Sequence, residues 1–436
     1  MRVGIQPNLD PSCGGIYQYS LTILDVISRL AKDWADDDFV LFADGLRSGE
    51  VAGVPNHRWT INPLHKPTAA SAALNALRRI VGEGPHREAW RYLRAKASAE
   101  TTPSAVPQDL DAPSHQEDIH QWFTTCGVNL MVYPAPTSLS FEAGIPYVMA
   151  IHDLQHRLQP HFPEVSADGE WERREYRYRN ASRNATLLLA DSEVGKEDIL
   201  NCYGSYGITP DRVKVLPFLP ASYLATDISQ SELDRVRRVY RLPERYIFYP
   251  AQLWPHKNHL RIIEALGLLK QDRGRLRIPV VFLGSHTGAI RERTFQEAMA
   301  AAARCGVQAD VHYLGYVPNS DMSALYAGAS ALVMPTFFGP TNIPVLEAWA
   351  FGCPVLTSDI RGVREQVGPA AVLVNPASAE AIADGIYRLW TDQTLVATLV
   401  RLGRDRLAEY TPCDFGRRLA SILAEAKTCI ANGTGD

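Results

Sequence analysis

The sequence lacks the cysteine pattern of a disulfide-rich or zinc-binding protein. Its seven cysteines are scattered, odd in number and without a Cys-x-x-Cys pair, so neither a disulfide framework nor a zinc site is indicated. It also lacks an uninterrupted apolar run of about 18 residues, the length that a membrane-spanning helix needs. The chain starts with a strand-like segment, Arg2 to Gln6, in place of a signal peptide. We therefore expect a cytoplasmic protein that does not span a membrane.

An excess of positive charge is missing as well. The formal net charge of the 436 residues is −4, which gives no general attraction to nucleic acid or to an anionic membrane. Metal-ligand patterns are weak: His152, His156 and His161 match no ordinary zinc spacing. The acidic residues 36–38 precede a strand, where a solvated turn is a simpler interpretation than a metal-binding Asp-x-Asp pair. We expect neither a metal nor another cofactor.

The sequence does have the composition of a soluble globular protein, with 46% hydrophobic and 21% charged residues. Short apolar strands alternate with helices in both halves, more regularly in the second. This pattern predicts an α/β fold of two facing Rossmann-like, doubly wound domains with a central cleft. We place the first domain at residues 1–222 and the second at residues 223–411, and we expect a helix at residues 412–430 to return to the first domain.

The alternation is interrupted over residues 44–118, which we interpret as an insertion in the first domain. Within it, residues 71–97 favour a helix that carries Arg and Lys among apolar residues. Such a helix could rest on a membrane surface or grip an anionic acceptor. An ordinary surface helix packed on the domain explains the pattern equally well. A peripheral contact with the inner face of the membrane is therefore an expectation for this segment alone.

Glu347 stands out because it interrupts an apolar helix face. The helix expected at residues 343–351 follows a buried strand at 331–334 and a loop rich in Gly, Pro and Asn. On a helical wheel, Ile343, Leu346 and Ala350 share one face, and Glu347 falls within it. An unpaired buried charge costs several kcal/mol, so this acid needs hydrogen-bond donors. Ribose hydroxyls would serve; a buried arginine or the backbone would serve as well.

Small and polar residues also collect where predicted strands end, the edge at which open α/β sheets bind ligands. Gly14-Gly15 lies at a strand-to-helix turn, where backbone amides can approach an anion; a turn without a ligand also fits. Ser192 follows a later strand as a helix cap. Lys257 begins a helix, where the dipole disfavours a cation, and an anionic ligand would reconcile it.

Together these segments resemble the retaining glycosyltransferases of family 4 (glycosyltransferase group 1), which have the GT-B fold. The resemblance covers almost the whole chain. Its motifs are Gly14-Gly15, His152 to His156, Asp191 to Glu193 with Lys196, Trp254 to His259, Tyr326 to Ala329 and, above all, Gly339 to Ala348.

Two positions depart from that pattern. Gly339 stands where a glutamate eight residues before Glu347 is usual, and Gln252 stands where an arginine five residues before Lys257 is usual. Both changes resemble the branch with a Phe-Gly-Pro-Thr-Asn-Ile-Pro loop, here residues 338–344. That branch is often found in bacterial surface-polysaccharide assembly.

The resemblance implies a role for each matching position. Lys257 and the Gly15 backbone would bind the diphosphate, and Glu347 the ribose. Tyr316 and Val317 would hold the base. The donor sugar would be held by His152 and by the amides of Thr341, Asn342 and Ile343. The expected catalytic residues are His152, Lys257 and Asn342. The expected donor site is Gly14, Gly15, Gln252, Lys257, Gly284, Tyr316, Val317, Thr341, Asn342, Ile343 and Glu347, and the expected acceptor side is Asp153, Ser192 and Lys196.

We therefore expect a metal-independent, retaining hexosyltransferase that moves a sugar from a nucleoside-diphosphate sugar to a hydroxyl of a glycan or lipid-linked glycan. Lys257, loop amides and a helix N-terminus would stabilise the charge on the departing diphosphate. Nothing in the sequence identifies a carboxylate nucleophile. Two alternatives stay open: a sugar-nucleotide epimerase or phosphorylase of the same architecture, and a sugar-nucleotide-binding subunit without turnover.

Overall fold

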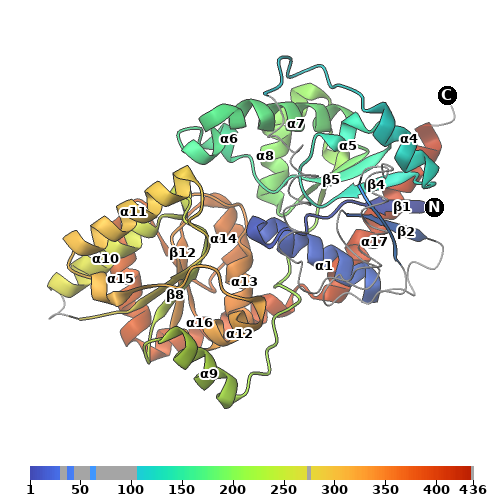
Figure 1. Ribbon diagram of the computed structural model, residues 1–436. Helices are drawn as coiled ribbons and strands as arrows, with labels where there is room; N and C mark the ends of the chain where they lie inside the picture. The colour runs from blue at the N-terminus through green and yellow to red at the C-terminus, as the bar shows by residue number, and fades with distance from the viewer. Residues whose placement is uncertain (30–36, 44–58, 65–105, 273–275, 434–436) are drawn as a thin grey trace, which may run out of the picture.

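The computed structural model describes residues 1–29, 37–43, 59–64, 106–272 and 276–433. These residues form two α/β domains, each built on a parallel sheet (Figure 1). The helix predicted over residues 71–97 and much of the insertion predicted over residues 44–118 lie outside the described residues. Among the residues that the structure describes, no helix combines the length and the apolar character needed to cross a membrane.

The first domain has a seven-stranded sheet, in the order β3-β2-β1-β4-β5-β6-β7 over the described residues. All of its strand pairs are parallel. The strands are β1 (Arg2–Ile5), β2 (Asp38–Phe42), β3 (Trp59–Asn62), β4 (Leu130–Tyr133), β5 (Tyr147–Ala150), β6 (Leu187–Ala190) and β7 (Val213–Val215). The helices are α1 (Gly15–Arg29), α4 (Glu117–Thr125), α5 (Leu139–Glu142), α6 (Gln155–Leu158), α7 (Glu170–Asn184) and α8 (Glu193–Tyr203).

Alternate residues of this sheet enter two separate cores, because successive side chains of a strand point to opposite faces. In β4, Leu130 and Val132 pack in the core with α1, and Met131 and Tyr133 pack in the core with α4, α5, α7 and α8. Helices therefore cover both faces. This explains why the central strands are apolar along their whole length.

The second domain has a six-stranded sheet, in the order β10-β9-β8-β11-β12-β13 over the described part of the chain. Its strands are β8 (Ile247–Pro250), β9 (Val280–Leu283), β10 (Val311–Tyr313), β11 (Ala331–Met334), β12 (Val355–Ser358) and β13 (Val372–Val374). Its helices are α9 (Gln230–Tyr240), α10 (His259–Asp272), α11 (Ala289–Arg304), α12 (Asn319–Ala327), α13 (Ile343–Ala350), α14 (Arg361–Val367), α15 (Ala379–Thr391) and α16 (Gln393–Ala408).

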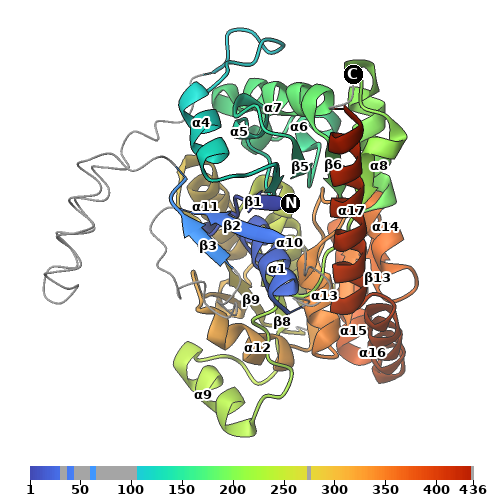
Figure 2. The ribbon, with the colours of Figure 1, turned by 90° about the vertical axis from the view of Figure 1, so that its right-hand side faces the viewer.

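The last helix, α17 (Pro412–Gly433), leaves the second domain and packs on the first. Figure 2 shows it running from the region of α16 up along the first domain. Phe415, Leu419 and Leu423 are completely buried in the same core as α1. Lys214 of β7 forms an ion pair with Glu425 at 2.5 Å. The first domain is therefore built from both ends of the chain.

Each sheet has one point where the strand order reverses, and ligands bind at such points in open α/β sheets. In the first sheet this point lies between β1 and β4, so the loop after β1, which leads to Gly14-Gly15, emerges there. In the second sheet it lies between β8 and β11, so the loops that carry Lys257 and Asn342 emerge there. The topology thus puts these three loops where a ligand site is expected.

Candidate functional site

Glu347 is buried in α13, with only 1% of its surface exposed. The hydroxyl of Tyr326, on α12, donates to its Oε2 at 2.5 Å. Its other oxygen, Oε1, is buried and accepts no regular hydrogen bond from the described residues. Burial raises the pKa of Glu347 to about 7, against the opposing effects of the Tyr326 hydroxyl and the Ala221 backbone. The carboxyl group therefore has room for one more donor, and the structure gives it no arginine within the described residues.

The loop between β11 and α13 is tied to the loop after β8. The side-chain amide of Asn258 donates to the carbonyls of Pro335 and Pro376, each at 2.7 Å. The Phe337 amide donates to the His256 carbonyl at 2.7 Å. Asn258 adopts a positive φ of 64°, a conformation that asparagine tolerates better than most residues. These hydrogen bonds join the loop between β11 and α13 to the turn that carries Lys257.

At the tip of that loop, some N–H groups already form hydrogen bonds and others do not. The Asn342 amide donates to Oε1 of Gln366 at 2.9 Å, so it is already used. The amides of Thr341 and Ile343 donate to no described residue. The side-chain Nδ2 of Asn342 is buried without a partner. The Asn342 amide, which was expected to hold the donor sugar, is thus already used, whereas the Asn342 side chain and the two neighbouring amides are not.

Lys257 closes the 3-10 turn η6 (Pro255–Lys257), just before α10. Burial lowers the pKa of its ammonium group to about 8, although Asp153 and Glu164 act in the opposite direction. It forms no salt bridge with any residue that the structure describes. A partly buried cation without a counter-ion is costly, so Lys257 is placed to gain from an anion.

Gln252, which follows β8, is held from two sides. Its Oε1 accepts from the Trp254 indole at 3.0 Å and from the Arg291 guanidinium at 2.7 Å. Arg291 belongs to the first turn of α11, and its guanidinium carbon lies 4.6 Å from the centre of the Trp254 ring. No motif in the sequence points to Arg291. Its guanidinium lies beside Gln252, and position 252 is the one at which the resemblance implies an arginine.

The Gly14-Gly15 turn of the first domain lies close to two residues of the second domain. Gly14 has a φ of 58°, in the left-handed region that favours glycine. A Cβ added to Gly14 would lie 3.6 Å from Nε2 of Gln252, and one added to Gly15 would lie 3.7 Å from Cδ1 of Ile343. The structure therefore brings the predicted phosphate turn against two predicted donor-site residues from the other domain.

His152 follows β5 and lies between Tyr19 and Phe218, with ring centres 5.0 Å and 5.6 Å away. Its Nε2 donates to the Pro134 carbonyl at 2.7 Å. Burial lowers its pKa, against the effects of that carbonyl and of Asp153, so the neutral ring is favoured. With the proton on Nε2, Nδ1 carries a lone pair and is a hydrogen-bond acceptor.

On the expected acceptor side, Asp153 forms an ion pair with Arg174 at 2.7 Å. Burial opposes its ionisation, but Arg174, the Gln155 backbone and His156 together hold the pKa of Asp153 below its usual range. Ser192 caps α8, because its Oγ accepts from the Gly195 amide at 3.0 Å. Lys196 forms no ion pair within the described parts of the chain.

The remaining predicted donor residues differ in exposure. The ring of Tyr316 is 69% exposed, whereas the Val317 side chain is buried in the core of the second domain. Only the backbone of Val317 is therefore left to meet a base. Gly284 has a φ of 126°, and a Cβ there would lie 2.5 Å from the Ala251 carbonyl oxygen. Any side chain at 284 would push the loop after β8 out of place.

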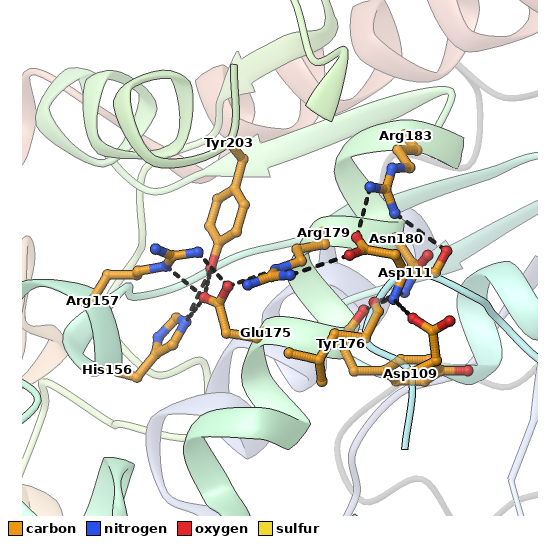
Figure 3. Close-up of polar contacts among 11 residues, drawn as sticks. Asp109, Asp111, His156, Arg157, Glu175, Tyr176, Arg179, Asn180, Arg183 and Tyr203 are labelled. Atoms are coloured by element: carbon orange, nitrogen blue, oxygen red, sulfur yellow. Dashed lines mark hydrogen bonds and ion pairs between the residues drawn. The ribbon is translucent and has the colours of Figure 1, made fainter. Parts of the chain in front are cut away.

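The three histidines at 152, 156 and 161 do not converge on one point. His156 is completely buried and donates to Glu175 at 2.9 Å, and the Tyr203 hydroxyl donates to the same oxygen at 2.7 Å. Figure 3 shows the Glu175 carboxylate between Arg157 and Arg179 as well. His156 thus belongs to a buried network that joins α6, α7 and α8. In the described segments no group of three or more His, Cys, Asp or Glu is placed to hold a metal ion.

The fold is GT-B, and the prediction of two Rossmann-like domains is confirmed. The chain is similar to the solved structure of Anabaena Alr3699/HepE in complex with UDP and glucose, with a TM-score of 0.65, 18% identity and coverage of 97% of this chain and 99% of the other. It is also similar to WaaG, a glycosyltransferase involved in lipopolysaccharide biosynthesis, with a TM-score of 0.61, 15% identity and coverage of 97% and 99%.

Residues 231–406 match the family of glycosyl transferases group 1, so the second domain contains a group 1 domain. The O-antigen chain mannosyltransferase B of Escherichia coli is 28% identical over 48% of this chain and 53% of its own length. The D-inositol 3-phosphate glycosyltransferase of Corynebacterium glutamicum (strain R) is 24% identical over 67% of this chain and 69% of its own. The chain thus spans about half the length of the first of these two relatives.

Proposed function

We propose that this protein is a retaining, metal-independent glycosyltransferase that moves a sugar from a nucleoside-diphosphate sugar to a hydroxyl group of a glycan or lipid-linked glycan. The observation that carries the proposal is a pair of unsatisfied groups at one sheet edge: Oε1 of Glu347 and the ammonium of Lys257. They lie on the loops and helix beside the switch point of the second sheet, and the Gly14-Gly15 turn approaches the same region. The group 1 match supports the assignment.

Each part of a nucleotide sugar finds a complementary group. Oε1 of Glu347 accepts from a ribose hydroxyl, which removes its missing hydrogen bond. Lys257 and the Gly14-Gly15 turn receive the diphosphate. The exposed ring of Tyr316 offers a stacking surface for the base. Nδ1 of His152 accepts from a hydroxyl of the donor sugar.

The transfer step uses charge stabilisation and no enzyme nucleophile. The acceptor oxygen bonds to the anomeric carbon on the face from which the diphosphate departs. The bond between that carbon and the diphosphate oxygen breaks, and its electron pair leaves with the diphosphate. The acceptor proton passes to a phosphate oxygen. Lys257 and the amides of Thr341 and Ile343 stabilise the charge that develops.

The acceptor binds on the side of the first domain. Asp153 is fixed by Arg174, and Lys196 is a cation without a partner among the described residues. Ser192 shapes this wall as the cap of α8. The relative from Escherichia coli named as an O-antigen chain mannosyltransferase supports a polysaccharide acceptor.

A thermal screen followed by product analysis tests the proposal. UDP-, GDP- and dTDP-sugars are compared for their effect on the unfolding temperature, because a ligand that binds only the folded state raises it. The best donor is then incubated with glycan acceptors in the presence and absence of EDTA. A glycoside with the donor's anomeric configuration, formed in EDTA, is the expected product. An isomeric sugar nucleotide would identify an epimerase, and tight binding without any product would identify a binding subunit.

Lys257→Ala is expected to lower kcat/KM by about tenfold to a thousandfold, the range for loss of a charge-stabilising group. Lys270→Ala, at the other end of α10, is the matched control and is expected to leave the rate unchanged. Steady-state kinetics with the donor from the screen give both values. A Lys257→Ala enzyme with the wild-type rate would remove Lys257 from the mechanism.

A further inference from the structure

Arg291 is a cation in an unfavourable place. It lies in the first turn of α11, where the helix dipole disfavours positive charge. Its Nε is buried and has no hydrogen-bond partner, and it forms no ion pair with a carboxylate in the described residues. Burial also lowers its pKa, against the effects of Cys13 and Tyr313. Within the described residues, this guanidinium therefore has no carboxylate to balance its charge.

The guanidinium is nevertheless held in one orientation. One face lies on the Trp254 ring, and one nitrogen donates to the Gln252 side chain at 2.7 Å. A Cβ added to Gly288 would lie 3.5 Å from another of its nitrogens, so residue 288 packs at contact distance beside the guanidinium. A fixed planar fork of donors suits a phosphate group better than a flexible ammonium does. Among its five N–H donors, the one on Nε is buried without a hydrogen-bond partner.

The residues around Arg291 indicate which ligand its guanidinium group binds. Gln252, which holds it, also approaches the Gly14 backbone. Cys13, next to that turn, is close enough to influence the charge of Arg291. Helix α11 also contacts the η6 turn that ends in Lys257. Arg291 thus lies beside both groups to which the proposed function assigns the diphosphate.

We propose that Arg291 binds the diphosphate of the donor as a second cation beside Lys257, and that Gln252 and Trp254 are the residues that position it. The inference rests on the proposed function, because it names a further residue of the same donor site. A nucleoside diphosphate carries more negative charge than a monophosphate, and a second cation increases the preference for the diphosphate. Arg291 therefore determines how strongly the site selects a diphosphate over a monophosphate.

Calorimetric titration with UDP, GDP and dTDP, and with UMP, GMP and dTMP, tests this assignment. For the nucleotide that binds best, Arg291→Gln is expected to weaken diphosphate binding by about tenfold to a hundredfold, as for a lost charge-assisted hydrogen bond. Monophosphate binding is expected to change by less than about threefold, because Lys257 still serves the single phosphate. Arg293→Gln is the matched control, since Arg293 is exposed on the same helix and pairs with Glu297.

Two further variants separate binding from folding. Arg291→Lys keeps the charge without the fork and is expected to recover part of the diphosphate affinity. The double variant Gln252→Arg, Arg291→Gln returns a guanidinium to the same space and is expected to restore the selectivity. If Arg291→Gln lowers only the unfolding temperature, or weakens both ligand classes equally, Arg291 is a structural residue and the inference is wrong. A wild-type protein that binds none of the six nucleotides would instead overturn the proposed function itself, and this inference with it.

Discussion

Glu347 shows how one residue can oppose stability and serve binding at the same site. Its carboxyl is buried with one unused oxygen, and burial raises its pKa from the ordinary 4.5 to about 7. Since the folded-state pKa lies above the unfolded one, the protonated form is favoured in the fold. The stability that this group contributes is complete below pH 4.5 and is lost as the pH rises to about 7.

Glu347→Gln should therefore stabilise the unliganded protein at pH 8, by about 1–3 kcal/mol, while weakening nucleotide binding about tenfold. The stability gain should disappear near pH 4, where the wild-type side chain is also neutral. Chemical denaturation at the two pH values and titration with the best nucleoside diphosphate measure both effects. Glu409→Gln, at an exposed ion pair, serves as the control. A loss of stability at pH 8 would show that the carboxylate is satisfied within the fold.

Sequence periodicity was sufficient to predict that Glu347 lies on the apolar face of its helix, because the apolar residues that define this face are close to it in the sequence. It could not supply its partner, since Tyr326 is 21 positions away on another helix. Arg291 was missed for the same reason: its contact with Gln252 joins residues 39 positions apart. The Gln366 side chain that occupies the Asn342 amide is likewise remote, 24 positions on. Such contacts depend on how helices pack, which a single sequence does not encode locally.

At the scale of elements, α14 of the second domain caps α8 of the first. The Glu365 carboxylate accepts from the amides of Glu193 and Val194 at 2.9 Å and 3.0 Å. These are the first two helical residues of α8, whose amides have no partner within the helix. Arg361, also on α14, pairs with Asp198 at 2.8 Å. A helix of one domain thus completes a helix of the other.

Glu365→Ala should free the two amides of α8 and cost about 1 kcal/mol, the usual effect of losing a helix N-cap. Hydrogen exchange at Glu193 and Val194 should accelerate, and small-angle scattering should detect a larger radius of gyration if the domains separate. Arg364→Ala is the control, because Arg364 also lies on α14 but pairs within its own domain, with Asp359. Unchanged exchange at both amides would show that this contact does not hold the domains together.

The elements themselves were predicted well where the pattern is regular. The strand expected at residues 331–334 is β11 with the same bounds, and the Ser192 cap is present. A short apolar run and a capping serine are both local signals, which a single sequence displays. The interdomain cap by Glu365 had no such signal, because a Glu on a short helix is equally typical of an ordinary surface.

At the scale of the whole molecule, several contacts join loops of the first domain to loops of the second. The His256 ring and Glu164 lie 2.5 Å apart, and the Gln159 side chain donates to the Phe337 carbonyl at 2.9 Å. The Thr341 hydroxyl donates to Asp191 of the first domain. Burial raises the pKa of Asp191 to about 7, although Thr341 and Ser192 act against this shift. The loop between β11 and α13, which carries Phe337 and Thr341, is therefore positioned partly by the first domain.

The same two-domain plan makes the first domain depend on the far end of the chain. Phe415 of α17 is completely buried in the first-domain core, whereas Leu399 of α16 is buried in the second-domain core. The two residues are close in sequence, but they should report on different domains. Hydrogen exchange resolved by segment can separate these contributions, because each core protects its own strands.

Phe415→Ala should destabilise the first domain by about 3–5 kcal/mol, the usual cost of removing a buried aromatic ring. Exchange should then accelerate in β1, β2 and β4, while β8 to β13 keep their protection. Leu399→Ala should give the reverse pattern at a cost of about 2–5 kcal/mol. Accelerated exchange in the second sheet alone after Phe415→Ala would mean that α17 belongs energetically to the second domain. The first domain would then have to be stable without the end of the chain, which its buried Phe415, Leu419 and Leu423 argue against.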